Sequence, residues 1–358
     1  MNKQQTVFVG LSGGVDSSVA ALRLKRQGYN VVGVFIKVWH PEWLVCNWEQ
    51  ERLDAMRVAA KLDIPFLTCD AEAAYRDDVA DYFITEYQAG RTPNPDVMCN
   101  KYVKFGRFLE FAQAHGADYI ATGHYAQRVD TDSGVELHRG VDTAKDQTYF
   151  LWTLTQEQLS KTLFPVGNSP KENIRNEAKA AGLLTADKKD SQGICFLGHI
   201  DMPEFLSHYI ELTRGEVLSE TGEVIGFHSG ALVYTIGQRQ GFTITSKDSN
   251  RSSYYVCGRD IARNTITVSS NKPQLPQSQT QCLADVSYTN TVVQPAAQIT
   301  VQNRYRQTPV PARIVESGEH TLTLTLMDKT DTPAFGQSCV LYRDTQCLGG
   351  GIIAPCPS

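Results

Sequence analysis

The chain has 358 residues, which allows two or three domains and a large buried core. With 41% hydrophobic and 20% charged residues it has the composition of a globular protein, and no apolar run approaches the ~20 residues that a membrane span needs. Its formal net charge of −5 excludes a global attraction to nucleic acid, so an RNA partner would have to be held by local basic patches.

The first patterned stretch is residues 7–20, VFVGLSGGVDSSVA. A short apolar run predicts a buried strand, and a helical pattern follows from about residue 16 to Gly28. Between them, Ser12, Gly13 and Gly14 allow a tight turn and a close approach of the backbone to a ligand. The N–H groups at the start of the helix attract an anion. The stretch fits neither the dinucleotide-binding nor the Walker pattern, and an ordinary strand–helix turn is the alternative.

The following segments continue as alternating strands and helices. Strands are predicted at 31–36, 64–69 and 118–122, and helices at 49–62, around 75–90 and around 105–112. This alternation predicts an α/β domain with a doubly wound parallel sheet. Ligands of such a sheet bind at the carboxyl ends of its strands, where residues 12–17, Lys37, Gly123 and His124 lie.

The second informative stretch is residues 90–104, GRTPNPDVMCNKYVK. Its two prolines stiffen a loop, and Asp96 is a candidate N-cap that would place Cys99 in the first turn of a helix. The helix dipole, with Lys101 and Lys104 nearby, would lower the pKa of the Cys99 thiol. The alternative is that Cys99 is a buried, unreactive packing residue.

A third stretch, residues 188–196 (KKDSQGICF), places Cys195 where a polar loop enters an apolar segment; on this pattern alone it too reads as a core residue. The other seven of the nine cysteines are interpreted as packing residues. An odd number of cysteines without a C-x-x-C pair argues against a disulfide framework and a zinc ribbon. With no signal-peptide pattern at the amino terminus, we expect a reducing, cytoplasmic setting, and no side-chain cluster that specifies a metal site.

The carboxyl-terminal part has the texture of an all-β protein. Glu220, Thr221 and Gly222 indicate a hairpin, and short strands are expected at 254–257 and 265–269. A Pro/Gln/Ser linker at 272–278 precedes segments that predict a small β-barrel at 298–305, 312–316, 321–327, 338–342 and 347–353. We expect a catalytic domain at 1–203, a mainly β central domain at 204–273 and a β-barrel domain at 274–358.

Taken together, the stretches resemble one family. They are GLSGGVDSS, GRTPNPDVMCN, ATGHY, KDQTYFL, KKDSQGICF, YTIGQRQG, RYRQ and CLGGGII, in this order along nearly the whole chain. The chain is similar to the bacterial tRNA-specific 2-thiouridylases (MnmA/TrmU), which are N-type ATP pyrophosphatases with a Rossmann-like phosphate-loop (PP-loop) domain. Two departures are the short hydrophobic stretch 39–48, WHPEWLVCNW, and Ile36, where methionine is usual.

The resemblance implies a role for particular residues. Cys99 would be the nucleophile, Cys195 would carry a persulfide sulfur, and Asp96 would assist as an acid or base. Contacts to ATP are expected from Gly10, Leu11, Ser12, Gly13, Gly14, Val15, Asp16, Ser17, Ile36 and Gly123. Contacts to tRNA are expected from Asn94, Pro95, Asp96, His124, Lys145, Asp146, Gln147, Arg304, Tyr305 and Gln337.

Each tRNA candidate also has a plain structural interpretation. His124 would cap the end of a strand, while Lys145 and Arg304 would be ordinary surface charges. Two segments nevertheless carry three basic and no acidic residues, at 99–109 and 300–315. Such local positive faces suit a clamp around an anticodon stem-loop.

The resemblance thus implies an ATP-dependent sulfurtransferase that makes 2-thiouridine at the wobble position of tRNA. ATP would be the co-substrate, with Mg²⁺ and Asp16 as its candidate ligand. A persulfide-donor protein would be the other partner, and a monomer is expected. The alternatives are a pyrophosphatase that adenylates a small metabolite or amidates a base, and a redox-sensing or RNA-binding module with a vestigial ATP site. Formation of AMP and pyrophosphate with and without tRNA discriminates among the three.

Overall fold

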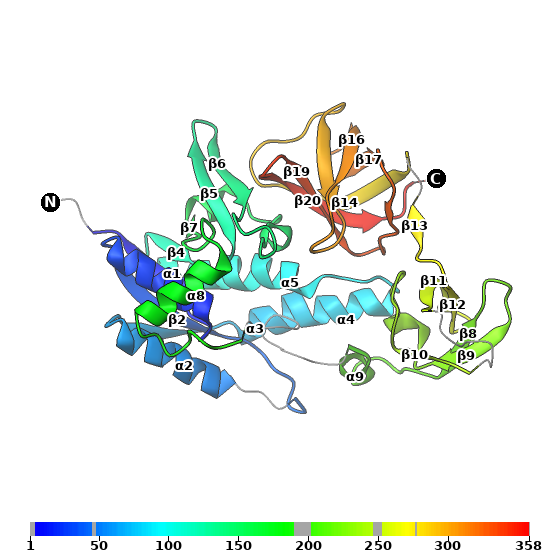
Figure 1. Cartoon of the computed structure of the whole chain (residues 1–358), viewed down its shortest axis with the longest axis horizontal. Coiled ribbons are helices and arrows are strands. Elements are labelled where there is room, and N and C mark those ends of the chain that lie inside the picture. Colours follow the sequence, from blue (N-terminus) through cyan, green and yellow to red (C-terminus); the bar gives the residue numbers. More distant parts are fainter. Residues whose placement is uncertain (1–3, 45–47, 190–201, 246–252, 276–277, 358) are drawn as a thin grey trace.

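The computed structural model describes residues 4–44, 48–189, 202–245, 253–275 and 278–357. Its amino-terminal half is built on a five-stranded parallel sheet in the order β3-β2-β1-β4-β7 (Figure 1). The strands are β1 (Thr6–Gly10), β2 (Asn30–Lys37), β3 (Phe66–Asp70), β4 (Tyr119–Ala121) and β7 (Thr162–Leu163). The expected doubly wound parallel sheet is confirmed.

Helices lie on both faces of this sheet (Figure 1). The helices of this half are α1 (Val15–Arg26), α2 (Trp48–Lys61), α3 (Glu72–Tyr75), α4 (Asp81–Gln88), α5 (Pro95–Met98), α6 (Phe108–Ala114), α7 (Gln156–Ser160) and α8 (Lys171–Ala180). Of these, α4 extends from the sheet to the central part, where its Phe83 and Tyr87 are buried (Figure 1). Two segments are π-helical, η1 (Arg76–Ala80) and η2 (Cys99–Arg107), and one is a 3-10 helix, η3 (Thr148–Phe150). Because side chains alternate along a strand, Val7 and Val9 pack into one apolar cluster and Phe8 into the other. This double burial explains why the strands read as continuous apolar runs.

The central part contains a second five-stranded sheet, in the order β10-β9-β8-β12-β11. Its elements are α9 (Met202–Ser207), β8 (Gly215–Leu218), β9 (Val224–His228), η4 (Ala231–Val233), β10 (Phe242–Ile244), β11 (Tyr255–Asp260) and β12 (Thr265–Ser269). The predicted hairpin is confirmed, because β8 and β9 pair antiparallel on either side of Gly222.

The carboxyl-terminal part is a closed barrel. Its strands are β14 (Thr280–Tyr288), β15 (Gln298–Gln302), β16 (Val310–Ser317), β17 (Leu322–Leu326), β19 (Ser338–Arg343) and β20 (Gln346–Ala354). β14 pairs with both β17 and β20, which closes the ring, while the short strands β13 (Gln274–Leu275) and β18 (Thr330–Asp331) pair with each other. The expected barrel is therefore confirmed.

A hairpin from the amino-terminal half joins this barrel. It consists of β5 (Ala126–Thr131) and β6 (Gly134–Arg139), and β6 pairs with β20 through Leu137 and Cys347. The sequence analysis did not predict this hairpin. It links the parallel-sheet region to the barrel by direct strand pairing.

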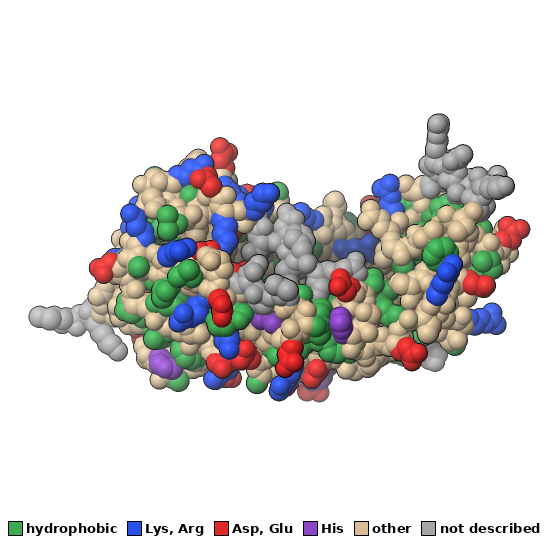
Figure 2. All heavy atoms as spheres, turned by 90° about the horizontal axis from the view of Figure 1, so that it is seen from below, with side chains coloured by type: hydrophobic (Ala, Val, Ile, Leu, Met, Phe, Trp, Pro, Cys, Tyr) green, Lys and Arg blue, Asp and Glu red, His purple; other side chains and the backbone are tan. Residues whose placement is uncertain are grey.

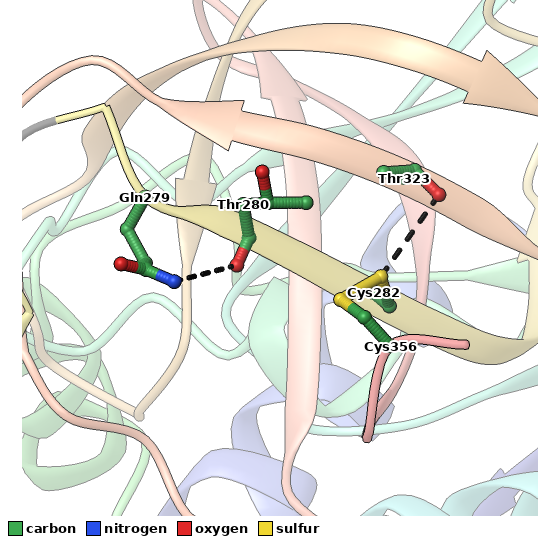
Figure 3. Close-up of a disulfide and its surroundings, with 5 residues drawn as sticks. All are labelled: Gln279, Thr280, Cys282, Thr323 and Cys356. Atoms are coloured by element: carbon green, nitrogen blue, oxygen red, sulfur yellow. Dashed lines mark hydrogen bonds between the residues drawn. A yellow bond between two sulfur atoms is a disulfide. The ribbon is translucent and has the colours of Figure 1, made fainter. Parts of the chain in front are cut away.

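The interpretation of Cys282 and Cys356 as packing residues is wrong. Cys282 of β14 and Cys356, which follows β20, form a disulfide with their Cα atoms 5.1 Å apart (Figure 3). The two residues are 74 positions apart and meet only because β14 pairs with β20, so no local motif could indicate the bond. Of the free cysteines that the structure describes, Cys69, Cys339 and Cys347 are buried, as expected for packing residues; Cys99 is also buried, and Cys257 is half-buried.

No helix within the described ranges is long and apolar enough to cross a membrane. Lysine and arginine side chains are interspersed with aspartate and glutamate on the face drawn in Figure 2. This mixed pattern agrees with the modest net charge and shows no large single-sign field on that face.

Candidate functional site

The loop between β1 and α1 has the geometry of an anion-binding turn. Gly14 is the N-cap of α1. Because glycine has no side chain that could accept a hydrogen bond, no side chain caps the first N–H groups of the helix, which point out of its amino-terminal end. The carbonyl oxygen of Gly14 accepts hydrogen bonds from the hydroxyls of Ser17 (3.2 Å) and Ser18 (2.7 Å). The backbone N–H of Ser12 donates to Ser17 Oγ at 3.3 Å. These bonds hold the loop in one conformation.

Two glycines make this arrangement possible. Gly13 has a φ of +71°, and a Cβ there would lie 2.8 Å from the carbonyl oxygen of Glu51 on α2. A Cβ at Gly123, which follows β4, would lie 2.7 Å from the backbone nitrogen of Ser17. The loop is thus pressed between α2 and the end of β4, at the carboxyl edge of the sheet where the sequence places it.

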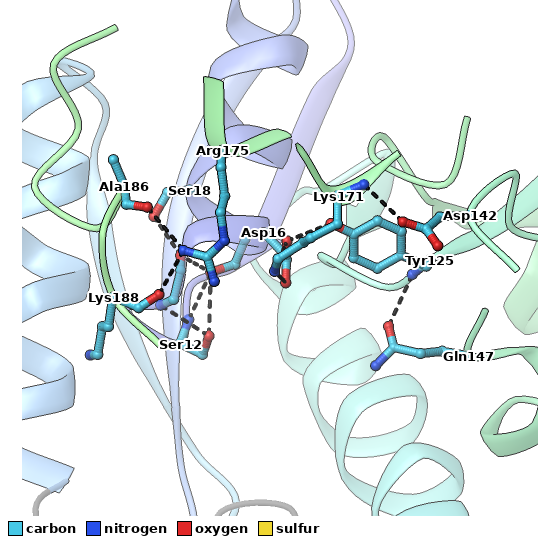
Figure 4. A network of polar contacts seen from close by, with 12 residues as sticks. Ser12, Asp16, Ser18, Tyr125, Asp142, Gln147, Lys171, Arg175, Ala186 and Lys188 are labelled. Carbon is cyan, nitrogen blue, oxygen red and sulfur yellow. Dashed lines mark hydrogen bonds and ion pairs between the residues drawn. The ribbon is translucent and has the colours of Figure 1, made fainter. Parts of the chain in front are cut away.

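A network of charged side chains surrounds the loop (Figure 4). Lys171 Nζ contacts both carboxylate oxygens of Asp16 at 2.8 Å, and the hydroxyl of Tyr125 donates to Asp16 Oδ1 at 2.8 Å. Lys188 Nζ contacts Asp54 Oδ2 at 3.0 Å. Asp54 borders Gly13, because a Cβ on that glycine would lie 3.0 Å from Asp54 Cβ.

Sequence reasoning did not assign a role to Lys171 or Arg175. They are four positions apart in α8, so both lie on one face of that helix. Arg175 Nη1 donates to the carbonyl oxygens of Ala186 (3.0 Å) and Lys188 (2.9 Å). Two cations four positions apart on one helix face were a signal for an anion site. The sequence alone, however, does not indicate that α8 packs beside α1, where the loop lies.

Ile36 lies at the end of β2 and is buried. Its Cδ1 would be 3.6 Å from a Cβ on Gly10, so it borders the strand that leads into the loop. Ile36 and Cys99 pack in the same apolar cluster. Ile36, the residue expected beside the adenine of ATP, and Cys99, the expected nucleophile, are therefore parts of the same apolar core.

The expected N-cap at Asp96 is wrong. Asn94 is the N-cap of α5, and its side-chain oxygen accepts from the N–H groups of Asp96 (3.1 Å) and Val97 (3.3 Å). Pro95 occupies the first helical position, where its missing N–H has no cost. Cys99 follows at the junction of α5 and η2 and is only 1% exposed. Cys195 lies outside the described residues.

His124 is buried at the end of β4. Its Nδ1 lies 2.8 Å from Thr122 Oγ1, and its ring packs against Phe105 and Phe164. Burial, with the charge of Lys104, lowers the pKa of His124 well below its usual value, so the ring is neutral at pH 7. The structure places His124 inside the protein.

The segment that contains Lys145, Asp146 and Gln147 makes internal hydrogen bonds. Asp146 is buried, receives N–H groups from Gly140 and Thr148, and pairs with Arg139 at 2.9 Å. The side-chain oxygen of Gln147 accepts from the backbone N–H of Tyr125 at 3.0 Å. Lys145 is half-buried. These bonds shape the turn that leads into η3.

Three further tRNA candidates lie where the parts of the chain meet. Arg304 Nη2 donates to the carbonyl oxygens of Ile236 (2.9 Å) and Thr332 (3.1 Å). The ring of Tyr305 packs on that of Phe150 with centroids 4.5 Å apart. The side-chain oxygen of Gln337 is buried and has no hydrogen-bond partner among the residues that the structure describes.

A pocket of about 560 Å³ lies beside this junction. Basic side chains outnumber acidic ones in its lining, which includes Lys272, Arg304, Arg306 and Lys329 together with Asp328 and Asp331. Lys272 and Asp331 form an ion pair. Polar groups of this kind can contact a phosphate backbone and a base edge.

Comparisons with known proteins cover almost the entire chain. Family models match the tRNA methyl transferase HUP domain at residues 5–199, the tRNA methyl transferase PRC-barrel domain at 203–270 and the aminomethyltransferase β-barrel domain at 278–353. A protein of Enterococcus faecalis named tRNA-specific 2-thiouridylase MnmA is 44% identical over 359 residues, which covers 98% of this chain and 96% of the relative. A protein of the same name from Listeria monocytogenes is 44% identical over 356 residues, covering 98% and 95%.

A solved structure of the U34-tRNA thiolase NcsA from Methanococcus maripaludis is 15% identical, with a TM-score of 0.36 over 55% of this chain and 62% of that one. At this level the likeness carries no argument. The matches to the two relatives over nearly the full length of both chains show the family. The chain belongs to the family of tRNA-specific 2-thiouridylases MnmA.

Proposed function

We propose that the protein is an ATP-dependent tRNA 2-thiouridylase that replaces the C2 oxygen of the wobble uridine with sulfur. The observation that carries this proposal is the glycine-bearing anion loop at the carboxyl edge of a parallel sheet, in a chain 44% identical to 2-thiouridylases along nearly its whole length. The proposed units are residues 1–203, 204–273 and 274–358. The first holds the loop and Cys99, and the other two form the remainder of an RNA clamp.

The first half-reaction activates the base. The C2 oxygen of uridine attacks the α-phosphorus of ATP, the bond from this phosphorus to the bridging oxygen of the β-phosphate breaks, and pyrophosphate leaves with the electron pair. The N3 proton of the uridine is released, and Asp96 is the candidate base. The anion loop from Gly10 to Ser17 would hold the phosphates, since helix N–H groups and serine hydroxyls donate to phosphate oxygens. Ile36 and Gly123 would border the nucleoside.

The second half-reaction delivers sulfur. The terminal sulfur of a Cys195 persulfide attacks C2, and AMP leaves with the former C2 oxygen. The Cys99 thiolate then attacks Cys195 Sγ, which breaks the sulfur–sulfur bond, leaves sulfur on the base and forms a Cys99–Cys195 disulfide. An external thiol reductant restores both cysteines. In the alternative order, Cys99 attacks first and releases hydrosulfide, which then attacks C2.

Magnesium fits the site as an ion carried by ATP. No group of three or more His, Cys, Asp or Glu residues that could hold a metal occurs in the described part of the chain. Asp16 offers one carboxylate beside the loop, and Mg²⁺ is commonly held by one carboxylate together with substrate phosphates. When bound, the ion would neutralise phosphate charge.

The RNA partner is proposed to lie across the junction of the three units. Asn94, Pro95 and Asp96 form the amino-terminal end of α5. The segment before them is anchored from two sides, because the N–H of Thr92 donates to Phe335 O at 2.8 Å and its hydroxyl lies 3.1 Å from Thr235 Oγ1. The basic pocket with Arg304 and Arg306 lies on the barrel side. We expect a cytoplasmic monomer that receives sulfur from a persulfide-donor protein.

The decisive experiment measures AMP and pyrophosphate formation from ATP with and without unmodified tRNA. The proposal predicts AMP only with tRNA, and 2-thiouridine when a persulfide donor is added. AMP formation that does not depend on RNA would indicate a pyrophosphatase acting on a small molecule. RNA binding without AMP would indicate a module with a vestigial ATP site.

A further inference from the structure

Two lysines reach the anion loop from different directions. Lys171 begins α8 and lies on Asp16, one residue inside α1. Lys188 comes from the segment after α8 and lies on Asp54, which borders Gly13 from the side of α2. Figure 4 shows Lys171 on one side of the loop and Lys188 on the other. The loop therefore has an ammonium group on each flank.

The Lys171 side chain is more enclosed than that of its partner Asp16. The side chain of Lys171 is 11% exposed and that of Asp16 is 29% exposed, and the ammonium lies 5.7 Å from the centre of the Tyr125 ring. A partly enclosed lysine beside the amino-terminal end of α1, which no side chain caps, adds positive charge at the place where the helix dipole already favours an anion.

We propose that Lys171 and Lys188 form the pyrophosphate subsite: they bind the β- and γ-phosphates of ATP and stabilise pyrophosphate as it leaves. The inference rests on the proposed ATP chemistry and assigns residues outside the loop to it. In the structure the two ammonium groups are balanced by Asp16 and Asp54, and phosphate oxygens take over part of that contact when the nucleotide binds. The negative charge that develops on the leaving group then meets two fixed cations.

Arg175 is the positioning residue of this subsite. Its Nη1 holds the carbonyl oxygens of Ala186 and Lys188, which fixes the backbone from which the Lys188 side chain extends. Figure 4 shows the guanidinium directed toward Ser12 of the loop. The hydroxyl of Thr185 donates to Ser18 Oγ at 3.1 Å, so the same segment is attached to α1 at a second point.

The test measures binding of inorganic pyrophosphate and of AMP by calorimetry, with a chelator present so that metal ions do not contribute. Lys171→Met and Lys188→Met should each weaken pyrophosphate binding about ten- to a hundredfold and leave AMP binding within about twofold. Lys179→Met is the matched control, because Lys179 lies in the last turn of the same helix, pairs with Asp187 and is exposed. Unchanged pyrophosphate binding in both variants, or none in the wild type, overturns the proposal.

A double variant separates direct binding from charge balance. If Lys171 only neutralises Asp16, then Asp16→Asn with Lys171→Met should bind pyrophosphate as the wild type does, and that result contradicts a direct contact. If Lys171 binds the phosphates, the double variant stays weak, and Lys171→Arg recovers most of the affinity. Because the readout is pyrophosphate binding without RNA, a failure of tRNA thiolation would leave this result intact, and the reverse also holds.

Discussion

Arg304 donates from Nη2 to the carbonyl oxygen of Ile236 at 2.9 Å, which joins the barrel to the loop after η4. The same nitrogen donates to Thr332 O within the barrel. A Cβ on Gly237, whose φ is +85°, would lie 3.3 Å from Arg304 Nη2, so the two loops are closely packed. Arg304 thus connects two parts of the chain whose sequence stretches, RYRQ and YTIGQRQG, were identified separately.

These contacts predict different roles for Arg304 and Arg306, which are only two positions apart in the sequence. Arg304→Ala should lower stability by about 2 kcal/mol, because two hydrogen bonds from a charged group to backbone oxygens are lost. Arg306→Ala should leave the melting temperature unchanged, weaken tRNA binding and reduce the slope of log affinity against log salt by about 1. Thermal melts and salt titrations of the two variants check this. Equal effects of both on RNA binding alone would contradict the linking role of Arg304.

The anion loop predicts different outcomes for substitutions of Gly13 and of Gly14. Gly14 has ordinary extended dihedral angles, so Gly14→Val should fold and lose ATP binding, because a branched side chain blocks the approach of phosphate to the backbone. Gly13→Val should also destabilise the fold, because of its positive φ and the 2.8 Å approach to Glu51 O. Melting temperature and nucleotide affinity, measured together, distinguish the two. Normal AMP formation by Gly14→Val would contradict the loop assignment.

Local patterns predicted the elements that depend on local energetics. The strand expected at 265–269 is β12 with the same bounds, and the turn at Gly13 requires a residue that tolerates positive φ. The β5–β6 hairpin was missed although it pairs locally, from Ala126–Arg139 to Thr131–Gly134; its attachment to the barrel, the pairing of Leu137 with Cys347, spans more than 200 positions. The sequence alone could not indicate that partner.

The same distinction applies to the site. The loop from Gly10 to Ser17 could be identified because its chemistry lies within eight consecutive positions. Lys171 could not, because its contact with Asp16 spans 155 positions and depends on the packing of α8 beside α1. The N-cap at Asn94 was missed although the sequence carried a signal for it: proline is favoured at the first helical position, so Asn94 directly before Pro95 is a better cap candidate than Asp96.

Burial of His124 predicts a dependence of stability on pH. Its pKa in the folded protein lies below the value of about 6.5 in the unfolded chain, so the unfolded state binds more protons below that pH. Stability should therefore fall as the pH decreases below about 6.5, by up to about 1.4 kcal/mol per pH unit for this group. Urea unfolding of wild type and His124→Asn between pH 5 and 8 checks it. Parallel curves would show that His124 does not contribute.

The Cys282–Cys356 disulfide predicts a redox-dependent stability of the barrel. Cys282→Ser should lower stability by roughly 2–4 kcal/mol under non-reducing conditions, because the closed loop restricts the unfolded chain. A thiol reductant should have the same effect on the wild type and none on the variant. Cys257→Ser, a free half-buried cysteine in β11, is the control. Identical melting of oxidised and reduced wild type would show that the bond does not form in solution.

The two half-reactions predict a separation between the cysteines and the ATP site. Cys195→Ser should still form AMP from ATP in the presence of tRNA, because adenylation requires only the anion loop and the bound uridine, but it should install no sulfur. Cys99→Ser should also lose thiolation; because Cys99 is only 1% exposed, burying the serine hydroxyl costs solvation, so a thermal melt must accompany this variant to show that it is folded. Neither variant should yield the internal disulfide after one turnover, as measured by non-reducing peptide mapping.

The disulfide step also sets a geometric requirement. Cys99 lies within the core cluster that also contains Ile36, and a disulfide with Cys195 requires that the two Cα atoms approach within roughly 4.4–6.8 Å when tRNA is bound. Thiolated tRNA from Cys195→Ser supplied with a persulfide donor would rule the mechanism out.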